Sequence, residues 1–101
     1  MIRSFSYAAW FGMDRYRVLN KDESEETLVC RAREWEKAAR DAFLSAYWEA
    51  MGARGDLLPA RAQAEAQLSA YVLEKSLYEL LYELNNRPQW LRIPLAGILS
   101  L

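Results

Sequence analysis

The apolar residues of this chain recur every three or four positions, and this periodicity constrains the fold more than any other feature of the sequence. Such spacing places apolar side chains on one face of an α-helix, whereas a half-buried strand needs apolar and polar residues in alternation. No segment sustains that alternation, and three prolines and four glycines separate the helical segments. The sequence therefore predicts an all-α fold without a sheet.

The first part of the chain predicts a helix and a capped loop. A short, aromatic-rich helix is expected from Ile2 to about Arg17, buried on more than one side. Residues 18–26 then form a loop and the start of the next helix, where Asp22 or Ser24 caps free backbone N–H groups. The acidic residues that follow favour the positive end of the helix dipole, so the acidic cluster has a structural explanation.

A long second helix is expected to end near Met51, before Gly52. Its apolar positions form one stripe, and we expect Trp35 to lie in the core. The stripe comprises Leu28, Ala32, Trp35, Ala39, Phe43, Ala46 and Ala50. Residues 52–59 predict a linker, with Pro59 at a position where a first-turn proline is tolerated.

The third helix should cover about Ala60 to Asn86, with Pro88 as the stop signal. Its predicted core stripe consists of four leucines: Leu73, Leu77, Leu80 and Leu84. Beyond it, a turn restarts at Gln89–Trp90, and a short apolar helix follows Pro94. The prediction is an antiparallel, up-and-down bundle of three main helices plus a short C-terminal helix.

Length and composition limit the classes of partner. At 101 residues and 11.7 kDa, residues 1–101 form a single helical domain or part of one. An apolar fraction of 52% exceeds what a thin bundle hides, so we expect part of the surface to meet a partner. Thirteen basic and fourteen acidic residues give a charge of -1, which predicts neither a nucleic-acid partner nor a membrane partner.

The single cysteine, Cys30, cannot close an internal disulfide and is interpreted as a packed thiol. We expect a cytoplasmic protein without a signal peptide or a transmembrane span. Catalysis needs a nucleophile with its base, and nucleotide binding needs clustered glycines, yet the sequence contains neither. We therefore predict no catalytic residue, no cofactor and no metal site within this chain.

One face of the third helix collects polar groups. At 100° per residue, four residues fall within about a third of a turn, roughly 140° from the leucine stripe. They are Glu79, Tyr82, Glu83 and Asn86, with Arg87 just beyond. Two interpretations remain open: a solvated flank on which Arg87 pairs a helix C-terminal carbonyl or an acid, or one wall of a sugar site.

Three segments in order resemble the end of the maltokinase family, which includes kinase modules fused to trehalose synthase. They are MIRSFSYAA at the start, the W-x(7)-F-x(3)-Y spacing of Trp35, Phe43 and Tyr47, and LEKSLYELLYELNNRPQWLRIPLAGI at the end. The last segment is the most specific of the three. Together the segments span nearly the whole chain.

The resemblance implies part of the helical C-terminal lobe of an aminoglycoside-phosphotransferase or protein-kinase-like fold. Such enzymes transfer the γ-phosphate of ATP to maltose and yield maltose 1-phosphate. The catalytic aspartate and the Mg²⁺ ligands of the family lie upstream of the position of Met1, so ATP and Mg²⁺ belong to the parent enzyme. The implied partners are the rest of the kinase and a trehalose synthase domain.

The resemblance also names the residues expected to contact or support the sugar: Tyr78, Glu79, Tyr82, Glu83, Asn86 and Arg87. Helical geometry places Tyr78 about 80° from the face that the others share, and packing against Trp90 is a further explanation for part of the pattern. The alternative function is a stand-alone helical interaction module, whose apolar faces pair two copies of the chain.

Overall fold

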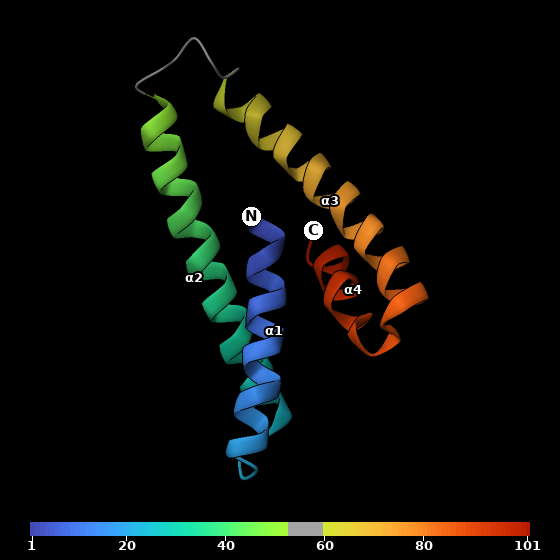
Figure 1. The fold of residues 1–101 in the computed structure, drawn as a ribbon. Helices are drawn as coiled ribbons and strands as arrows, with labels where there is room; N and C mark the ends of the chain where they lie inside the picture. Colours follow the sequence, from blue (N-terminus) through green and yellow to red (C-terminus); the bar gives the residue numbers. More distant parts are fainter. Residues whose placement is uncertain (53–59) are drawn as a thin grey trace. The chain divides into compact units, whose positions relative to one another are not determined.

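The computed structural model describes residues 1–52 and 60–101, and every regular element in these ranges is helical (Figure 1). The helices are α1 (Ile2–Leu19), α2 (Glu25–Gly52), α3 (Arg61–Asn86), the 3-10 turn η1 (Pro88–Trp90) and α4 (Arg92–Leu99). The all-α prediction is confirmed for these residues. The predicted linker falls largely on residues 53–59, which lie outside the described residues, as does Pro59.

The chain divides into two compact units, Met1–Trp48 and Glu49–Leu101. The first consists of α1 and most of α2, and the second holds the last turn of α2 together with α3, η1 and α4. Each unit has its own packing. The up-and-down bundle of all three long helices stays a prediction.

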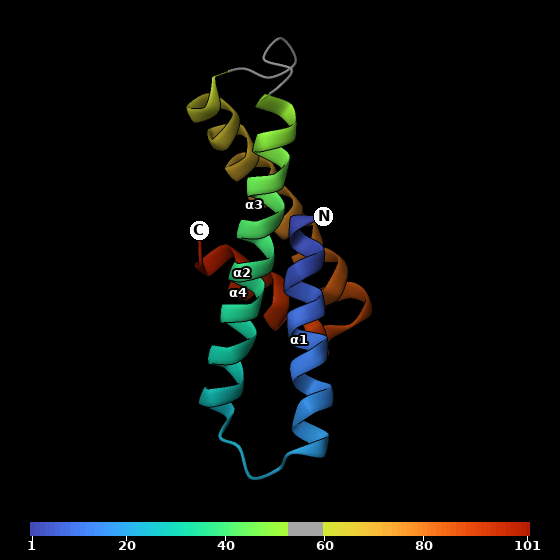
Figure 2. The ribbon, with the colours of Figure 1, turned by 90° about the vertical axis from the view of Figure 1, so that its left-hand side faces the viewer.

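In the first unit, α1 and α2 lie antiparallel, joined by a short loop (Figure 2). Phe5 of α1 meets two rings of α2 edge to face, with centroids 6.4 Å from Trp35 and 5.9 Å from Phe43. Beneath these rings, Ala9, Met13 and Leu28 are buried. Edge-to-face aromatic pairs add stability beyond the area that they bury, so this seam holds the hairpin together.

The start of α2 follows the predicted cap. Ser24 Oγ accepts a hydrogen bond from the backbone N–H of Thr27 at 3.2 Å, and α2 begins at the next residue after Ser24. An N-cap side chain satisfies a backbone donor that has no partner within the helix. The expectation that Asp22 or Ser24 caps the helix is thus confirmed at Ser24.

Two expectations for this unit are wrong. The buried positions of α1 (Arg3, Ser6, Ala9 and Met13) recur every three or four residues and so lie on one side of the helix, not on several. Trp35 lies on the expected stripe but is 50% exposed, although Phe5 of α1 contacts it edge to face. A two-helix contact is too narrow to enclose a side chain of that size.

Polar side chains take part in the same α1–α2 contact. Arg3 Nη1 donates to Ser6 Oγ at 2.8 Å, and Ser6 Oγ donates in turn to Glu36 Oε1 of α2. Arg3 and Ser6 are both buried. Buried polar groups need such partners, because leaving one unpaired costs more than the bond itself contributes.

In the second unit, α3 ends where the sequence predicts, and α4 packs back against its C-terminal part (Figure 1). The Arg87 N–H donates to the Glu83 carbonyl at 2.8 Å and closes the last turn. Pro88 then opens η1, since its missing N–H cannot continue the helix. Pro94 is buried in the first turn of α4, so the last helix begins at Arg92 and not after Pro94 as predicted.

The predicted leucine core of α3 is wrong. Leu73, Leu77 and Leu84 are 40%, 50% and 56% exposed, and Leu80 is half-buried. The buried residues of α3 are instead Ala64, Ser76, Glu79 and Glu83. At 100° per residue, Ser76 and Glu83 lie roughly 80–120° from Leu77 and Leu84 around the helix. The buried side of α3 is therefore offset from the leucine stripe, and three of its four buried residues are polar.

Candidate functional site

The six residues implied by the resemblance occupy the last turns of α3 and its C-cap, Arg87 (Figure 1). Helical periodicity brings five of them to one side of the helix, but their environments differ. Glu79 and Glu83 are 8% and 1% exposed, whereas Tyr78, Tyr82 and Asn86 are exposed. The interpretation of this face as a solvated flank is therefore wrong for its two carboxylates.

The central contact of the site is an ion pair between Glu83 and Arg87. Arg87 Nε donates to Glu83 Oε2 at 2.8 Å, and Arg87 Nη2 donates to Glu83 Oε1 at 2.7 Å. The pairing of Arg87 with an acid is thus confirmed. Two parallel N–H···O hydrogen bonds fix the orientation of the guanidinium fork of Arg87 relative to the carboxylate, which a single hydrogen bond cannot do.

Arg87 also lies against two aromatic rings. Its guanidinium carbon is 4.3 Å from the centre of the Trp90 ring and 5.4 Å from that of Tyr82. The expected packing against Trp90 is thus present, and Arg87 is the residue that packs on its ring. Because the Arg87 side chain is still 41% exposed, the guanidinium is held by protein on some sides and remains open to solvent on others.

The exposed residues Asn86 and Tyr82 lie close to the Glu83–Arg87 pair. Asn86 Nδ2 donates to the Tyr82 backbone carbonyl at 2.9 Å, one turn earlier on α3. The Asn86 side chain is therefore bonded to its own helix. Tyr82 keeps an exposed ring beside Arg87.

Tyr78 lies one helical turn before Tyr82 on α3. Lys75 Nζ lies 5.0 Å from the centre of its ring, and the ring is exposed. The structure brings together Tyr82, Glu83, Asn86 and Arg87.

Trp90 is the residue whose place the sequence left open. Periodicity could not assign it, because it follows the helix stop and belongs to the η1 turn. The available signal was local: Trp90 stands three residues after Arg87 and two after Pro88. The Trp90 N–H donates to the Arg87 carbonyl at 2.9 Å, and this turn returns the indole to the arginine.

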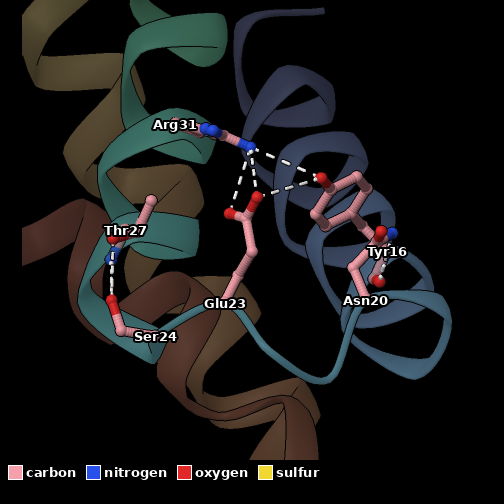
Figure 3. A network of polar contacts seen from close by, with 6 residues as sticks. All are labelled: Tyr16, Asn20, Glu23, Ser24, Thr27 and Arg31. Atoms are coloured by element: carbon pink, nitrogen blue, oxygen red, sulfur yellow. Dashed lines mark hydrogen bonds and ion pairs between the residues drawn. The ribbon is translucent and has the colours of Figure 1, made fainter.

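A second polar cluster lies in the first unit, where the α1–α2 loop is fastened to both helices (Figure 3). Arg31 Nη1 reaches Glu23 Oε2 at 3.1 Å and Tyr16 Oη at 3.4 Å, while Tyr16 Oη donates to Glu23 Oε1 at 3.3 Å. The hydrogen bond with Tyr16 and the charge of Glu23 raise the pKa of the Arg31 guanidinium. The members come from α1, the loop and α2, so the cluster fixes the hairpin turn.

Next to this cluster, a cavity of about 390 Å³ opens between α1 and α2. Small residues of α1, including Ala9 and Gly12, form one wall, and Leu28 and Trp35 of α2 form another. Its lining is mostly apolar, with Tyr16 and Arg31 as its polar members.

Cys30 differs from its expected packed state. The thiol is free and exposed on α2, and Sγ lies 3.7 Å from Glu34 Oε1. Among residues 1–52 and 60–101, no three His, Cys, Asp or Glu side chains gather in a way that would hold a metal ion. None of the helices in these ranges combines the length and the apolar character needed to cross a bilayer.

Comparison with known proteins adds no assignment to this geometry. No protein-family model matches the chain, and no solved structure matches it either.

Proposed function

We propose that this chain is the sugar-acceptor side of a maltokinase-like enzyme, which phosphorylates maltose with ATP, and that it is inactive when isolated. The proposal rests on the resemblance of three segments: residues 1–9, the segment around Phe43, and residues 73–98. One geometric observation supports it: in the most specific segment, Glu83 holds the partly exposed Arg87 beside the exposed ring of Tyr82.

This arrangement suits a sugar chemically. Sugar hydroxyls both donate and accept hydrogen bonds, and a guanidinium supplies several donors in a fixed plane. An exposed aromatic ring offers an apolar face with a polar edge. In the proposed site, Arg87, Tyr82 and Asn86 contact the sugar, while the buried carboxylates of Glu79 and Glu83 support them.

The chemistry of phosphoryl transfer comes from the rest of the kinase in this proposal. Transfer to a hydroxyl needs a base that accepts its proton and Mg²⁺ that neutralises the phosphate charge. The N-terminal lobe and the catalytic segment would supply these groups, together with ATP. A fused trehalose synthase domain, which would supply maltose to the kinase, and a cytoplasmic location belong to the same proposal.

Steady-state kinetics of the full-length kinase test the proposal. Arg87→Ala and Tyr82→Ala should each lower kcat/KM for maltose about tenfold or more, because each removes a direct contact, while KM for ATP stays unchanged. Tyr71→Ala is the matched control, since Tyr71 is an exposed tyrosine on the same helix, outside the site. Wild-type maltose kinetics in both site variants would remove α3 from the acceptor site.

A second function is favoured by the exposed leucines of α3. Leu73, Leu77, Leu80 and Leu84 are spaced 4-3-4, which is the spacing of a coiled-coil seam, and most of this row is exposed. A contiguous exposed apolar row marks a protein contact more often than a solvated surface. In this alternative, the chain is a dimerisation module that pairs the α3 rows of two copies.

Sedimentation equilibrium of the 101-residue chain distinguishes the two functions. The dimerisation module predicts a dimer that Leu77→Glu dissociates and that Leu99→Glu, an exposed control on α4, leaves intact. A monomer at all concentrations, or a dimer that survives Leu77→Glu, would exclude the leucine row as its interface.

A further inference from the structure

Three groups meet at the end of α3 in what we call the Arg87 cluster: Glu83, Arg87 and Trp90. The carboxylate of Glu83 holds the edge of the guanidinium through two hydrogen bonds of 2.8 and 2.7 Å. The indole of Trp90 lies 4.3 Å from the guanidinium carbon. The carboxylate therefore fixes the in-plane direction of the guanidinium, and the indole holds the guanidinium carbon over its ring.

These two restraints are complementary. A bidentate carboxylate sets where the N–H groups point, but the plane of an ion pair still rocks about the axis that joins its two charges. Contact with an aromatic face limits this motion, because the cation is attracted to the centre of the ring. Arginine otherwise has a large rotamer entropy, so both restraints reduce the entropy that is lost when a ligand orders the Arg87 side chain.

The backbone makes Trp90 well suited to this task. Pro88 fixes the chain direction directly after Arg87, and the Trp90 N–H bonds to the Arg87 carbonyl at 2.9 Å within η1. The indole is thus attached through a short, hydrogen-bonded turn to the residue that it touches. Such a support is more rigid than one supplied by a distant loop.

We infer that Trp90 is a positioning residue: its indole holds the partly exposed Arg87 guanidinium in the orientation in which it receives the acceptor sugar. The role in sugar binding rests on the proposed function. The restraint on Arg87 does not, because it follows from the contacts within this chain. The two parts are therefore tested separately.

The restraint is measured on the 101-residue chain by NMR, through exchange of the Arg87 Nε–H proton with water. In the wild type, Glu83 Oε2 accepts this proton, and the indole limits the motion that would release it. Trp90→Leu should speed exchange about fivefold or more, and Trp90→Phe, which keeps an aromatic face, should stay close to the wild type. Trp35→Leu is the control for loss of an indole elsewhere in the chain.

Unchanged exchange in Trp90→Leu would overturn the inference, because Arg87 would then be held without the Trp90 indole. Equal acceleration in Trp90→Phe and Trp90→Leu would also overturn it, since the aromatic face would not matter. A folded backbone spectrum in each variant shows that exchange reports the side chain and not global unfolding.

The sugar part is measured by kinetics of the full-length kinase. Trp90→Leu should raise KM for maltose about five- to tenfold with a smaller change in kcat and none in KM for ATP, and Trp90→Phe should rescue it. Faster exchange of the Arg87 Nε–H proton in Trp90→Leu, with an unchanged KM for maltose, would overturn the positioning role. Wild-type maltose kinetics in Arg87→Ala would instead reject the proposed function, and the exchange result would still decide the restraint.

Discussion

The two units of this chain use the same secondary structure but pack by different rules. In the first unit, the apolar period of α2 coincides with the side that contacts α1: Leu28 begins the stripe and is buried, and Phe5 lies against Trp35 and Phe43, although both rings stay partly exposed. In the second unit they diverge. The leucines of α3 are exposed, while Glu79 and Glu83 are buried.

This difference shows that periodicity identifies a helix more reliably than it identifies the buried face. A helix packs on one side, and the pattern records where apolar residues lie, not which neighbour covers them. On α3 the residues of the packed side form local polar contacts, such as the Glu83–Arg87 pair. The exposed leucines would be explained by contact with a partner, such as the second copy in the proposed dimer.

The largest expected effect is the difference in stability loss between truncation of the buried Leu28 and truncation of the exposed Leu77. Leu28→Ala should lower the free energy of unfolding by about 3 kcal/mol, because the side chain is buried and leaves a cavity. Leu77→Ala should cost less than about 1 kcal/mol in the monomer, because Leu77 is already half exposed. Urea denaturation followed by tryptophan fluorescence measures both, and equal losses would contradict the assigned faces.

The next effect concerns the polar face of α3. Arg87→Ala should lower the free energy of unfolding by about 2 kcal/mol, because it deprives the buried Glu83 carboxylate of its bidentate partner. Lys37→Ala is the matched control: it breaks an i,i+4 pair with Asp41 that has a similar length, 2.7 Å, but is largely exposed. Urea denaturation should show a much smaller loss for Lys37→Ala, and similar losses would mean that burial does not distinguish the pairs.

A smaller effect is expected at the hairpin turn of the first unit. Tyr16→Phe deletes the hydroxyl that bonds to Arg31 and Glu23 and should cost about 0.5 kcal/mol, because the group is partly exposed. Amide hydrogen exchange should show faster local opening of residues 20–24 in this variant. Tyr71→Phe, which alters an exposed tyrosine of α3, should leave those residues unchanged.

The smallest effect is a pH dependence on the surface of α2. The hydrogen bond from Lys37 lowers the pKa of Asp41 below its usual 3.8. The folded state therefore favours the ionised carboxylate, so the pair stabilises at neutral pH, and its contribution disappears as pH falls through the folded-state pKa. An NMR titration of the Asp41 carboxyl carbon checks the direction: Lys37→Ala should raise this pKa, and a midpoint that does not move would exclude the pair.

The ends of the helices were predictable because they depend on neighbouring residues. Ser24 supplies an oxygen that caps the first turn of α2, and Pro88 lacks the N–H that would continue α3. The pairing of Arg87 with an acid was also foreseen, since a residue four positions earlier on a helix lies within its reach.

The candidate site was predictable in part. Helical angles correctly placed Tyr82 and Glu83 near Arg87. They did not predict that Glu79 and Glu83 would be buried, because the angle of a residue on its own helix does not reveal what packs there. They also gave no position to Trp90, whose indole reaches Arg87 through a turn and not along a helix.

By itself, the sequence determined that this protein is helical in its described parts, where α2 begins and where α3 ends, because capping and proline chemistry act over a few residues. The tertiary structure alone decided that Leu77 faces solvent, that Glu83 is buried and that Trp90 lies on Arg87. Burial depends on which elements come to cover a face, and a ring contact depends on the path of the chain between them. Both are properties of packing, which a periodic pattern on one helix does not specify.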